Sequence, residues 1–217
     1  MKKILYTLLF CVFGVTSMMA QHNPWDISIG GKIGANYGTL TTLKGDAVIT
    51  PSIAANIEMS FSDKWGMAME VGYKRYALKN VHMSAAEITD KFPNMSLSSV
   101  LSNAGDYDYS IDYIDVNYFI KYYTKYHLNL YSGIKMGRML HGKVEHNGEN
   151  TSLRKKIHHG NFSFPIGVEY EYKNYTFDVR YELGIQHLGI TDQAKKMLGS
   201  SRTSSLCFTM GYRLLLM

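Results

Sequence analysis

The sequence predicts an all-β protein, an eight-stranded antiparallel up-and-down transmembrane β-barrel. Three observations lead to this fold class. Apolar and polar residues alternate with a period of two in eight segments. The connections between these segments are alternately short and long. Bulky apolar side chains occupy one face of the segments, and small or charged side chains occupy the other. In outer-membrane barrels the short turns and both termini lie on the periplasmic side.

The overall composition excludes several other classes of protein. The chain has 217 residues, of which 46% are hydrophobic and 19% charged, so it is neither disordered nor collagen-like. After residue 20 no apolar run approaches the length of about 20 residues that a membrane-spanning helix needs. A barrel is not subject to this limit, because only every second residue of its strands must be apolar.

The first twenty residues have the features of a secretory signal peptide. Lys2 and Lys3 precede a mostly apolar stretch over residues 4–15, and Ala20 is a suitable cleavage position. We therefore expect a signal peptide over residues 1–20 and a barrel domain over residues 21–217. Cleavage removes two of the 23 basic residues, which leaves 21 against 18 acidic residues and argues against nucleic acid as a partner. Cys207 is then the only cysteine, so no internal disulfide is expected.

Each predicted strand carries apolar residues on one parity. In the first, Ile29 and Ile33 alternate with Ser28 and Lys32, a pattern typical of a half-buried strand. The eight segments are residues 25–37, 52–61, 66–75, 114–122, 128–137, 162–171, 175–184 and 206–214. Tight turns are expected at 62–65, 123–126 and 173–174, and long loops at 39–50, 78–106, 141–159 and 186–203. In the longest loop, Ser84 and Glu87 have capping-box spacing, which predicts either a short surface helix or a polar loop without fixed structure.

The size and charge of the side chains decide which face points outward. A soluble, lipocalin-like periplasmic barrel would show the same alternation with its faces reversed. The interior of an eight-stranded barrel is just wide enough for side chains to fill, so the bulky apolar set would overfill it. We therefore expect the apolar face to contact lipid and seven acids and six bases to pair in the lumen. These residues are Lys32, Glu58, Glu70, Lys74, Asp115, Lys121, Lys135, Glu169, Glu171, Asp178, Arg180, Glu182 and Arg213.

Aromatic residues gather near both predicted strand ends, as the interfacial girdles of membrane barrels do. The inner girdle is expected to contain Trp25, Trp65, Tyr122, Tyr123, Tyr126, Tyr172 and Tyr175, and the outer girdle Tyr107, Tyr109 and Tyr113.

Two stretches carry a resemblance to a known family. They are residues 29–36 (IGGKIGAN) and residues 113–123 (YIDVNYFIKYY), the second of which leads through a tight turn to residues 133–137 (GIKMG). The chain resembles the small outer-membrane β-barrel proteins of the PorT-like type, often labelled "porin family" or "outer membrane beta-barrel protein". Asp115 and Asn117 stand where that family often has a Glu-x-Pro step. The resemblance implies a fold and a location in the bacterial outer membrane, and no single activity.

No motif indicates catalysis, a cofactor or a metal. His141, His146, His158 and His159 share one predicted loop, but their spacing matches no familiar zinc motif. No Gly-x-Ser-x-Gly nucleophile elbow is present, so we expect a protein that is not an enzyme. The function expected is a structural or interaction role in the envelope, including one associated with secretion. A rim-located enzyme acting on lipid or peptide stays open as the alternative.

The expected partners are outer-membrane lipid and, during insertion, the barrel-assembly machinery. Arg75 and Arg138 are exceptions on the lipid-facing parity, each at the long-loop end of its strand. At that height arginine costs little and can hold a phosphate through two hydrogen bonds. Both residues are therefore predicted either to contact lipopolysaccharide or to lie in solvent just beyond the membrane.

Overall fold

The computed structural model describes residues 23–216, apart from the side chain of Gln193. The predicted signal peptide, residues 1–20, lies outside these residues. The strands are β1 (Ile27–Leu40), β2 (Asp46–Ala47), β3 (Ile49–Ser60), β4 (Trp65–Met83), β5 (Gly105–Tyr123), β6 (Leu128–His146), β7 (Glu149–Ser152), β8 (Gly160–Tyr172), β9 (Tyr175–Gly184) and β10 (Thr203–Leu215). The helices are α2 (Ala85–Lys91), α3 (Leu97–Asn103) and α4 (Asp192–Leu198), and none in the described part of the chain is long and apolar enough to cross a membrane.

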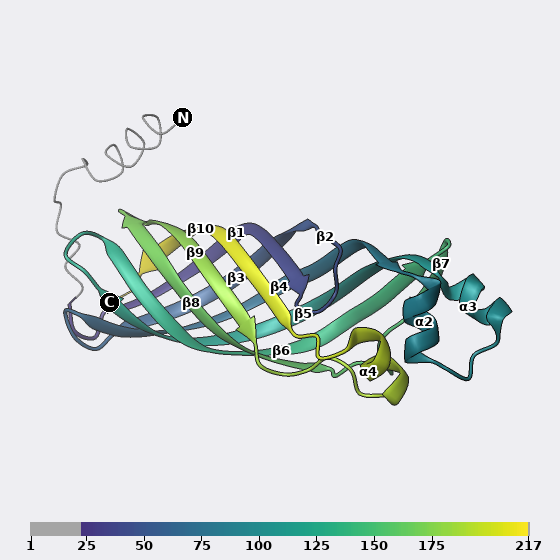
Figure 1. Ribbon diagram of the computed structural model, residues 1–217. Coiled ribbons are helices and arrows are strands. Elements are labelled where there is room, and N and C mark those ends of the chain that lie inside the picture. The colour runs from purple at the N-terminus through teal and green to yellow at the C-terminus, as the bar shows by residue number, and fades with distance from the viewer. Residues whose placement is uncertain (1–22, 217) are drawn as a thin grey trace, which may run out of the picture.

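Eight of the described strands form a closed barrel (Figure 1). Around the ring the order is β1, β3, β4, β5, β6, β8, β9 and β10, and β10 pairs with β1 to close it. Every pair is antiparallel and every neighbour is the next barrel strand along the chain, as an up-and-down barrel requires. The predicted fold class is therefore confirmed. The two short strands, β2 and β7, extend the sheet beyond the ring by pairing with β4 and β6.

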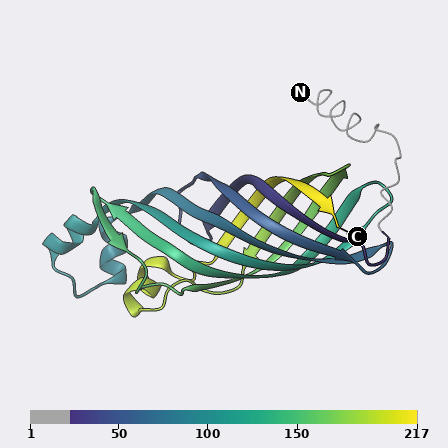
Figure 2. The same cartoon turned by 180° about the vertical axis from the view of Figure 1, so that it is seen from behind.

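The two ends of the barrel differ. The short turns lie at the end where β1 begins and β10 ends, whereas α2, α3, α4 and β7 project from the opposite end (Figures 1 and 2). By the rule for such barrels the first end is periplasmic and the second faces the outside of the cell.

The two faces of the wall have opposite chemistry. Outward residues are apolar and exposed, with Ile33 at 65% and Phe164 at 49% relative exposure. On neighbouring positions the inward residues are charged and buried, and Glu169 has no exposed surface. A soluble barrel would show the reverse, so this arrangement fits a wall that faces lipid.

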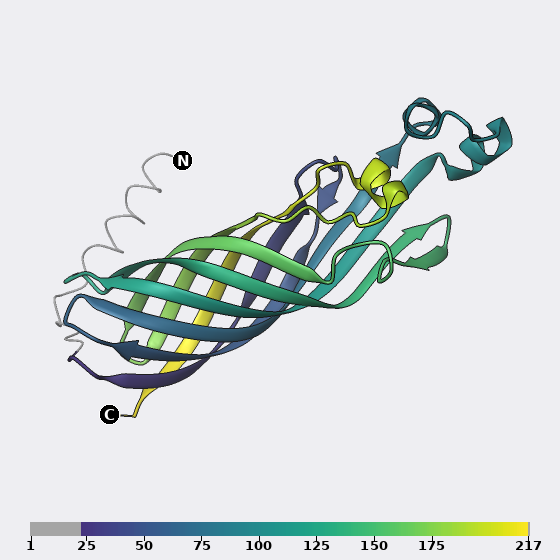
Figure 3. The same ribbon diagram turned by 90° about the horizontal axis from the view of Figure 1, so that it is seen from below.

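Three strands are about twice as long as the sequence predicted. Strands β4, β5 and β6 have 19 residues each, whereas a strand needs only about 9–11 residues to cross the membrane. The predictions of loops at 78–106 and 141–159 are therefore wrong at their edges, since β4 continues to Met83, β5 begins at Gly105 and β6 ends at His146. Figure 3 shows these strands continuing past the barrel rim. The other two predicted loops contain β2 and α4.

The strand extensions escaped prediction because their polarity is reversed. Outside the membrane the inward side becomes apolar and the outward side polar, as in a soluble protein. On β4 the inward series passes from Lys74 to Tyr76 and Leu78, both at most 2% exposed. A β-bulge between Leu78 and Val81 shifts the register of the strand, and a second irregularity lies opposite Asp112 and Tyr113. The extensions thus enclose a separate apolar cluster beneath α2 and α4.

The structure corrects part of the girdle prediction. Tyr107, Tyr109 and Tyr113 do not face lipid but point inward, at most 6% exposed, and join the apolar cluster of the outer region. Tyr123 also points inward, and its hydroxyl donates a hydrogen bond to Glu58. On the outer surface Trp65 and Tyr122 do pack edge to face at 5.0 Å, next to the short turns.

The predicted capping box is present. Ser84 accepts a hydrogen bond from the Glu87 backbone, and the Glu87 carboxylate accepts one from the Ser84 backbone. Helix α2 begins at this point, so the helical alternative for this segment is the correct one.

Candidate functional site

The most unusual feature of the molecule is its charged interior. All thirteen residues predicted for the inward face lie there, twelve of them at most 6% exposed, with Arg213 half-buried near the periplasmic end. Ion pairs connect all thirteen into one network. It runs through the barrel in three levels.

The inner level surrounds Glu58 and Glu171. Arg213 forms two hydrogen bonds to Glu171, of 2.8 and 2.9 Å, and lies 3.5 Å from Glu58. Lys121 donates to Glu58 at 2.5 Å and to Glu169 at 2.6 Å, which joins this level to the next. The hydroxyl of Tyr123 completes the coordination of Glu58 at 2.8 Å.

The middle level contains Lys32, Glu70, Asp178 and Arg180. Lys32 donates to Glu169 at 2.8 Å and lies 3.6 Å from Glu70 and 3.8 Å from Asp178. Arg180 donates to Glu70 at 2.8 Å.

Aromatic side chains fill the space beside the charges of the middle level. The Arg180 guanidinium lies 5.3 Å from the centre of the Phe119 ring, and this ring packs edge to face with Tyr131 at 4.9 Å. The hydroxyl of Tyr131 in turn donates a hydrogen bond to Asp178. Phe119 and Tyr131 therefore close the lumen at mid-height.

The outer level is organised by Glu182. Its carboxylate accepts hydrogen bonds from Lys74 and Lys135, both at 2.6 Å, and lies 3.2 Å from Arg180. Lys135 also pairs with Asp115 at 3.3 Å. Directly above, Tyr76 accepts a hydrogen bond of 2.8 Å from Lys135 through its hydroxyl, while its ring lies in the apolar cluster.

Several members of the network were not predicted. Tyr76 and Tyr123 continue the inward parities of β4 and β5, so extending those alternations by one step would have included them. Cys207 lies 3.0 Å from Lys74 and is completely buried. It occupies the inward parity of β10, but a cysteine gives no charge signal in a sequence pattern.

A small void lies between the middle and outer levels. Its volume is about 20 Å³, enough for one water molecule. Five lining atoms have no hydrogen-bond partner among the described residues, namely Ser52 Oγ, Glu70 Oε2, Asp115 Oδ1, Asn117 Oδ1 and Arg180 Nε. A space of this size does not form a solute pathway.

The two outward arginines have different surroundings. Arg75 forms a two-bonded ion pair with Asp112 on the adjacent strand, at 2.5 and 3.1 Å. Arg138 is exposed, and no ion pair is found for it within residues 23–216. Together with Asp112 they mark the height at which the apolar outer surface ends.

The histidines do not gather at one point. His146 stacks on Tyr107, and His159 hydrogen-bonds to the carbonyl of Arg154. Within the described residues no group of three or more His, Cys, Asp or Glu side chains is arranged to hold a metal ion.

A closed barrel with an apolar exterior and a charged, filled interior defines an integral β-barrel membrane protein. A family model for the outer membrane protein beta-barrel domain matches residues 19–188, and the chain belongs to that family. The protein is therefore located in the bacterial outer membrane, and a soluble periplasmic barrel is excluded.

The chain is also similar to several solved structures. The attachment invasion locus protein Ail of Yersinia pestis, in complex with the heparin analogue sucrose octasulfate, is 14% identical, with a TM-score of 0.47, over 88% of this chain and 99% of that one. Neisserial surface protein A is 12% identical, with a TM-score of 0.49, over 86% and 96%. The outer membrane protein OprG from Pseudomonas aeruginosa is 14% identical, with a TM-score of 0.42, over 90% and 99%. No curated protein matches the chain.

Proposed function

We propose that this protein is a non-conducting barrel that anchors an outer region at the cell surface, with a structural or interaction role and no enzymatic activity. The observation that carries the proposal is the filled lumen. Thirteen paired charges, together with Phe119 and Tyr131, occupy an interior that an eight-stranded wall makes narrow. Such a barrel offers no route for solutes, so its distinctive surface is the part outside the membrane.

Single-channel recording tests the closed lumen. We expect the mature protein in planar bilayers to produce no stable conductance steps, because moving an ion through the network would break buried ion pairs. Accessibility of the outer region to added protease verifies insertion, and a porin in the same bilayer verifies the recording. A large, stable conductance would contradict the proposal.

The resemblance to PorT-like proteins supports a finer assignment, an interaction role associated with secretion. The strand motifs at residues 29–36 and 113–123 carry it. Cross-linking in intact envelopes, comparing the full protein with a variant in which residues 84–104 are replaced by a short turn, tests this role. Partners lost only from the variant would be bound by the outer region. The barrel-assembly machinery should be captured by both proteins, since it acts on the strands.

A lipopolysaccharide contact at Arg138 is part of the same proposal. Its guanidinium is exposed at the end of the apolar belt, where a lipid A phosphate would lie, whereas Arg75 already holds Asp112. Lipopolysaccharide in the membrane should therefore raise the melting temperature of the wild type more than that of Arg138→Gln, by about 2–4 °C for each kcal/mol of lost contact. Arg75→Gln should keep most of the increase. Equal stabilisation of all three proteins would remove Arg138 as a phosphate ligand.

A further inference from the structure

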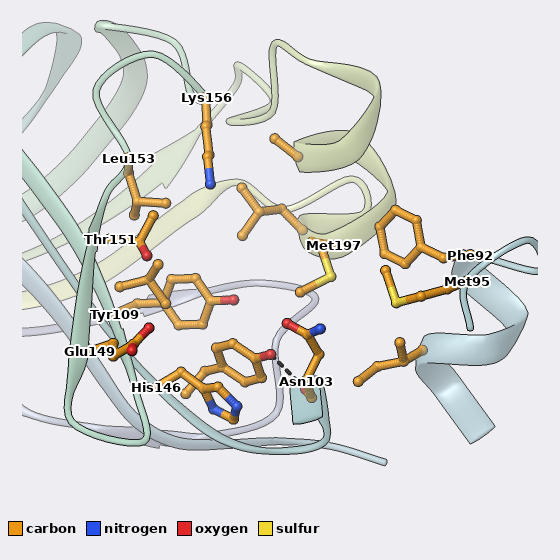
Figure 4. A pocket seen from close by; sticks show the side chains of 15 residues that line it. Phe92, Met95, Asn103, Tyr109, His146, Glu149, Thr151, Leu153, Lys156 and Met197 are labelled. Carbon is orange, nitrogen blue, oxygen red and sulfur yellow. Dashed lines mark hydrogen bonds between the residues drawn. The ribbon is translucent and has the colours of Figure 1, made fainter. Parts of the chain in front are cut away.

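The outer region contains a cavity that the closed lumen does not explain. Its volume is about 350 Å³, within the range of small-molecule sites. Residues from α2, α3, α4, β5, β6 and β7 line it, so segments distant in the sequence build it together. Figure 4 shows Phe92, Met95 and Met197 on one side and Tyr109 and Leu153 on the other.

Most of the lining residues are apolar, and the Tyr109 hydroxyl is a buried polar group among them. Tyr109 is only 5% exposed, and its hydroxyl points into the cavity (Figure 4). This hydroxyl has no hydrogen-bond partner among the described residues, although its neighbour Tyr107 donates to the carbonyl of Asn103. Burial, with the nearby Tyr107, raises the pKa of Tyr109. The hydroxyl therefore keeps its proton and is available as a donor.

The charged side chains on the cavity wall, among the described residues, are Lys156 and Glu149. Lys156 points from the rim into the cavity, and no ion pair involves it within the described part of the chain (Figure 4). Lys196, on α4, lies with its Nζ 5.6 Å from the centre of the Phe92 ring, which lines the cavity. Glu149 lies on β7. Lys156 and the Tyr109 hydroxyl are two donors on the same cavity, and together they favour a ligand with an anionic oxygen.

We propose that this cavity binds a small amphiphile with an aromatic or aliphatic body and a single carboxylate. The body lies among Met95, Met197 and Phe92, where thioethers and a ring adapt to an irregular apolar shape. The carboxylate accepts a hydrogen bond from the Tyr109 hydroxyl, and Lys156 supplies the opposite charge. This site goes beyond the anchoring role and does not depend on whether the lumen conducts.

The experiment uses phenylpropanoate as probe, with phenylpropanol and phenylpropylamine as matched neutral and cationic analogues. The mature protein is placed in lipid nanodiscs with methyl-labelled methionine. Met95 and Met197 line the cavity, whereas Met67 and Met69 face lipid, so the methyl signals separate cavity binding from partition into the bilayer. We expect saturable shifts at Met95 and Met197, strongest with the carboxylate and weakest with the amine.

Single substitutions identify the two polar contacts. Tyr109→Phe and Lys156→Gln should each raise the dissociation constant of phenylpropanoate by about threefold to tenfold, the usual range for one lost hydrogen bond. Lys155→Gln is the matched control and should leave it unchanged, because Lys155 is exposed and does not line the cavity. Shifts confined to Met67 and Met69, no saturable shift at all, or tighter binding of the amine would each overturn the proposal.

Discussion

Glu70→Leu and Arg180→Leu should each lower the free energy of unfolding by about 3–5 kcal/mol, because each leaves a buried charge without its main partner. Glu70 holds Arg180 at 2.8 Å and accepts a hydrogen bond of 3.1 Å from Asn117. Both side chains are at most 3% exposed, so water cannot replace the lost contact. Urea unfolding of the refolded protein in detergent micelles measures the effect.

The double variant and a surface control sharpen this test. Removing both partners should cost less than the sum of the single variants, since neither charge is then left unpaired. Lys155→Leu should change the stability by no more than about 0.5 kcal/mol, as is usual for an exposed site. Equal stability of Glu70→Leu, Arg180→Leu and Lys155→Leu would mean that the lumen network does not hold the barrel together.

Gly133→Ala should destabilise the barrel by about 3 kcal/mol or more, through overpacking against backbone. A Cβ at this position would collide with the carbonyl oxygen of Tyr118 and lie 3.0 Å from the Cα of Phe119. Backbone atoms of β5 cannot yield without breaking the β5–β6 pairing, whereas a flexible side chain could rotate away.

Gly31→Ala is the matched control for this prediction, because its new Cβ would meet only the carbonyl oxygen of Ala54 at 3.9 Å. It should be within about 0.5 kcal/mol of the wild type. Unfolding can be followed by the difference in gel mobility between folded and heated protein. If Gly133→Ala matched Gly31→Ala, the close approach of β5 and β6 at this point would be wrong.

The sequence was sufficient for the membrane part of the fold. A regular alternation of apolar outward residues and polar inward residues located all eight barrel strands. It also assigned residues such as Glu70 and Arg180 to the interior. This pattern failed outside the membrane because the inward side of the strands becomes apolar there. On β4, Lys74 is inward and charged, whereas Tyr76 and Leu78 farther along are inward and apolar. A search for strands with an apolar, lipid-facing side therefore stops at this reversal. It assigns the outer parts of β4, β5 and β6 to loops.

The candidate sites were predictable to different degrees. Ion pairing in the lumen follows from near-equal numbers of acids and bases on one parity, but the choice of partners depends on barrel geometry. No sequence pattern indicated the outer cavity, because its walls come from α2, α3, α4 and three strands that meet only in the folded chain. The aromatic residues on its floor were assigned to the girdle, since an inward tyrosine and a lipid-facing tyrosine look alike in sequence.

Because β4 and β5 continue through the rim, they also determine the height of the cavity relative to the membrane. Tyr109, on the floor of the cavity, pairs with Leu78, three residues beyond Arg75. This is roughly 10 Å along the strand and, at a strand tilt of about 40°, roughly 8 Å along the bilayer normal, and the rest of the cavity lies farther out. The headgroup layer on one side of a bilayer is only about 5–8 Å deep. The cavity therefore opens into the aqueous phase and not into the acyl layer. Its occupancy depends on the concentration of ligand dissolved outside the cell, and a compound held entirely within the bilayer has no direct path to it.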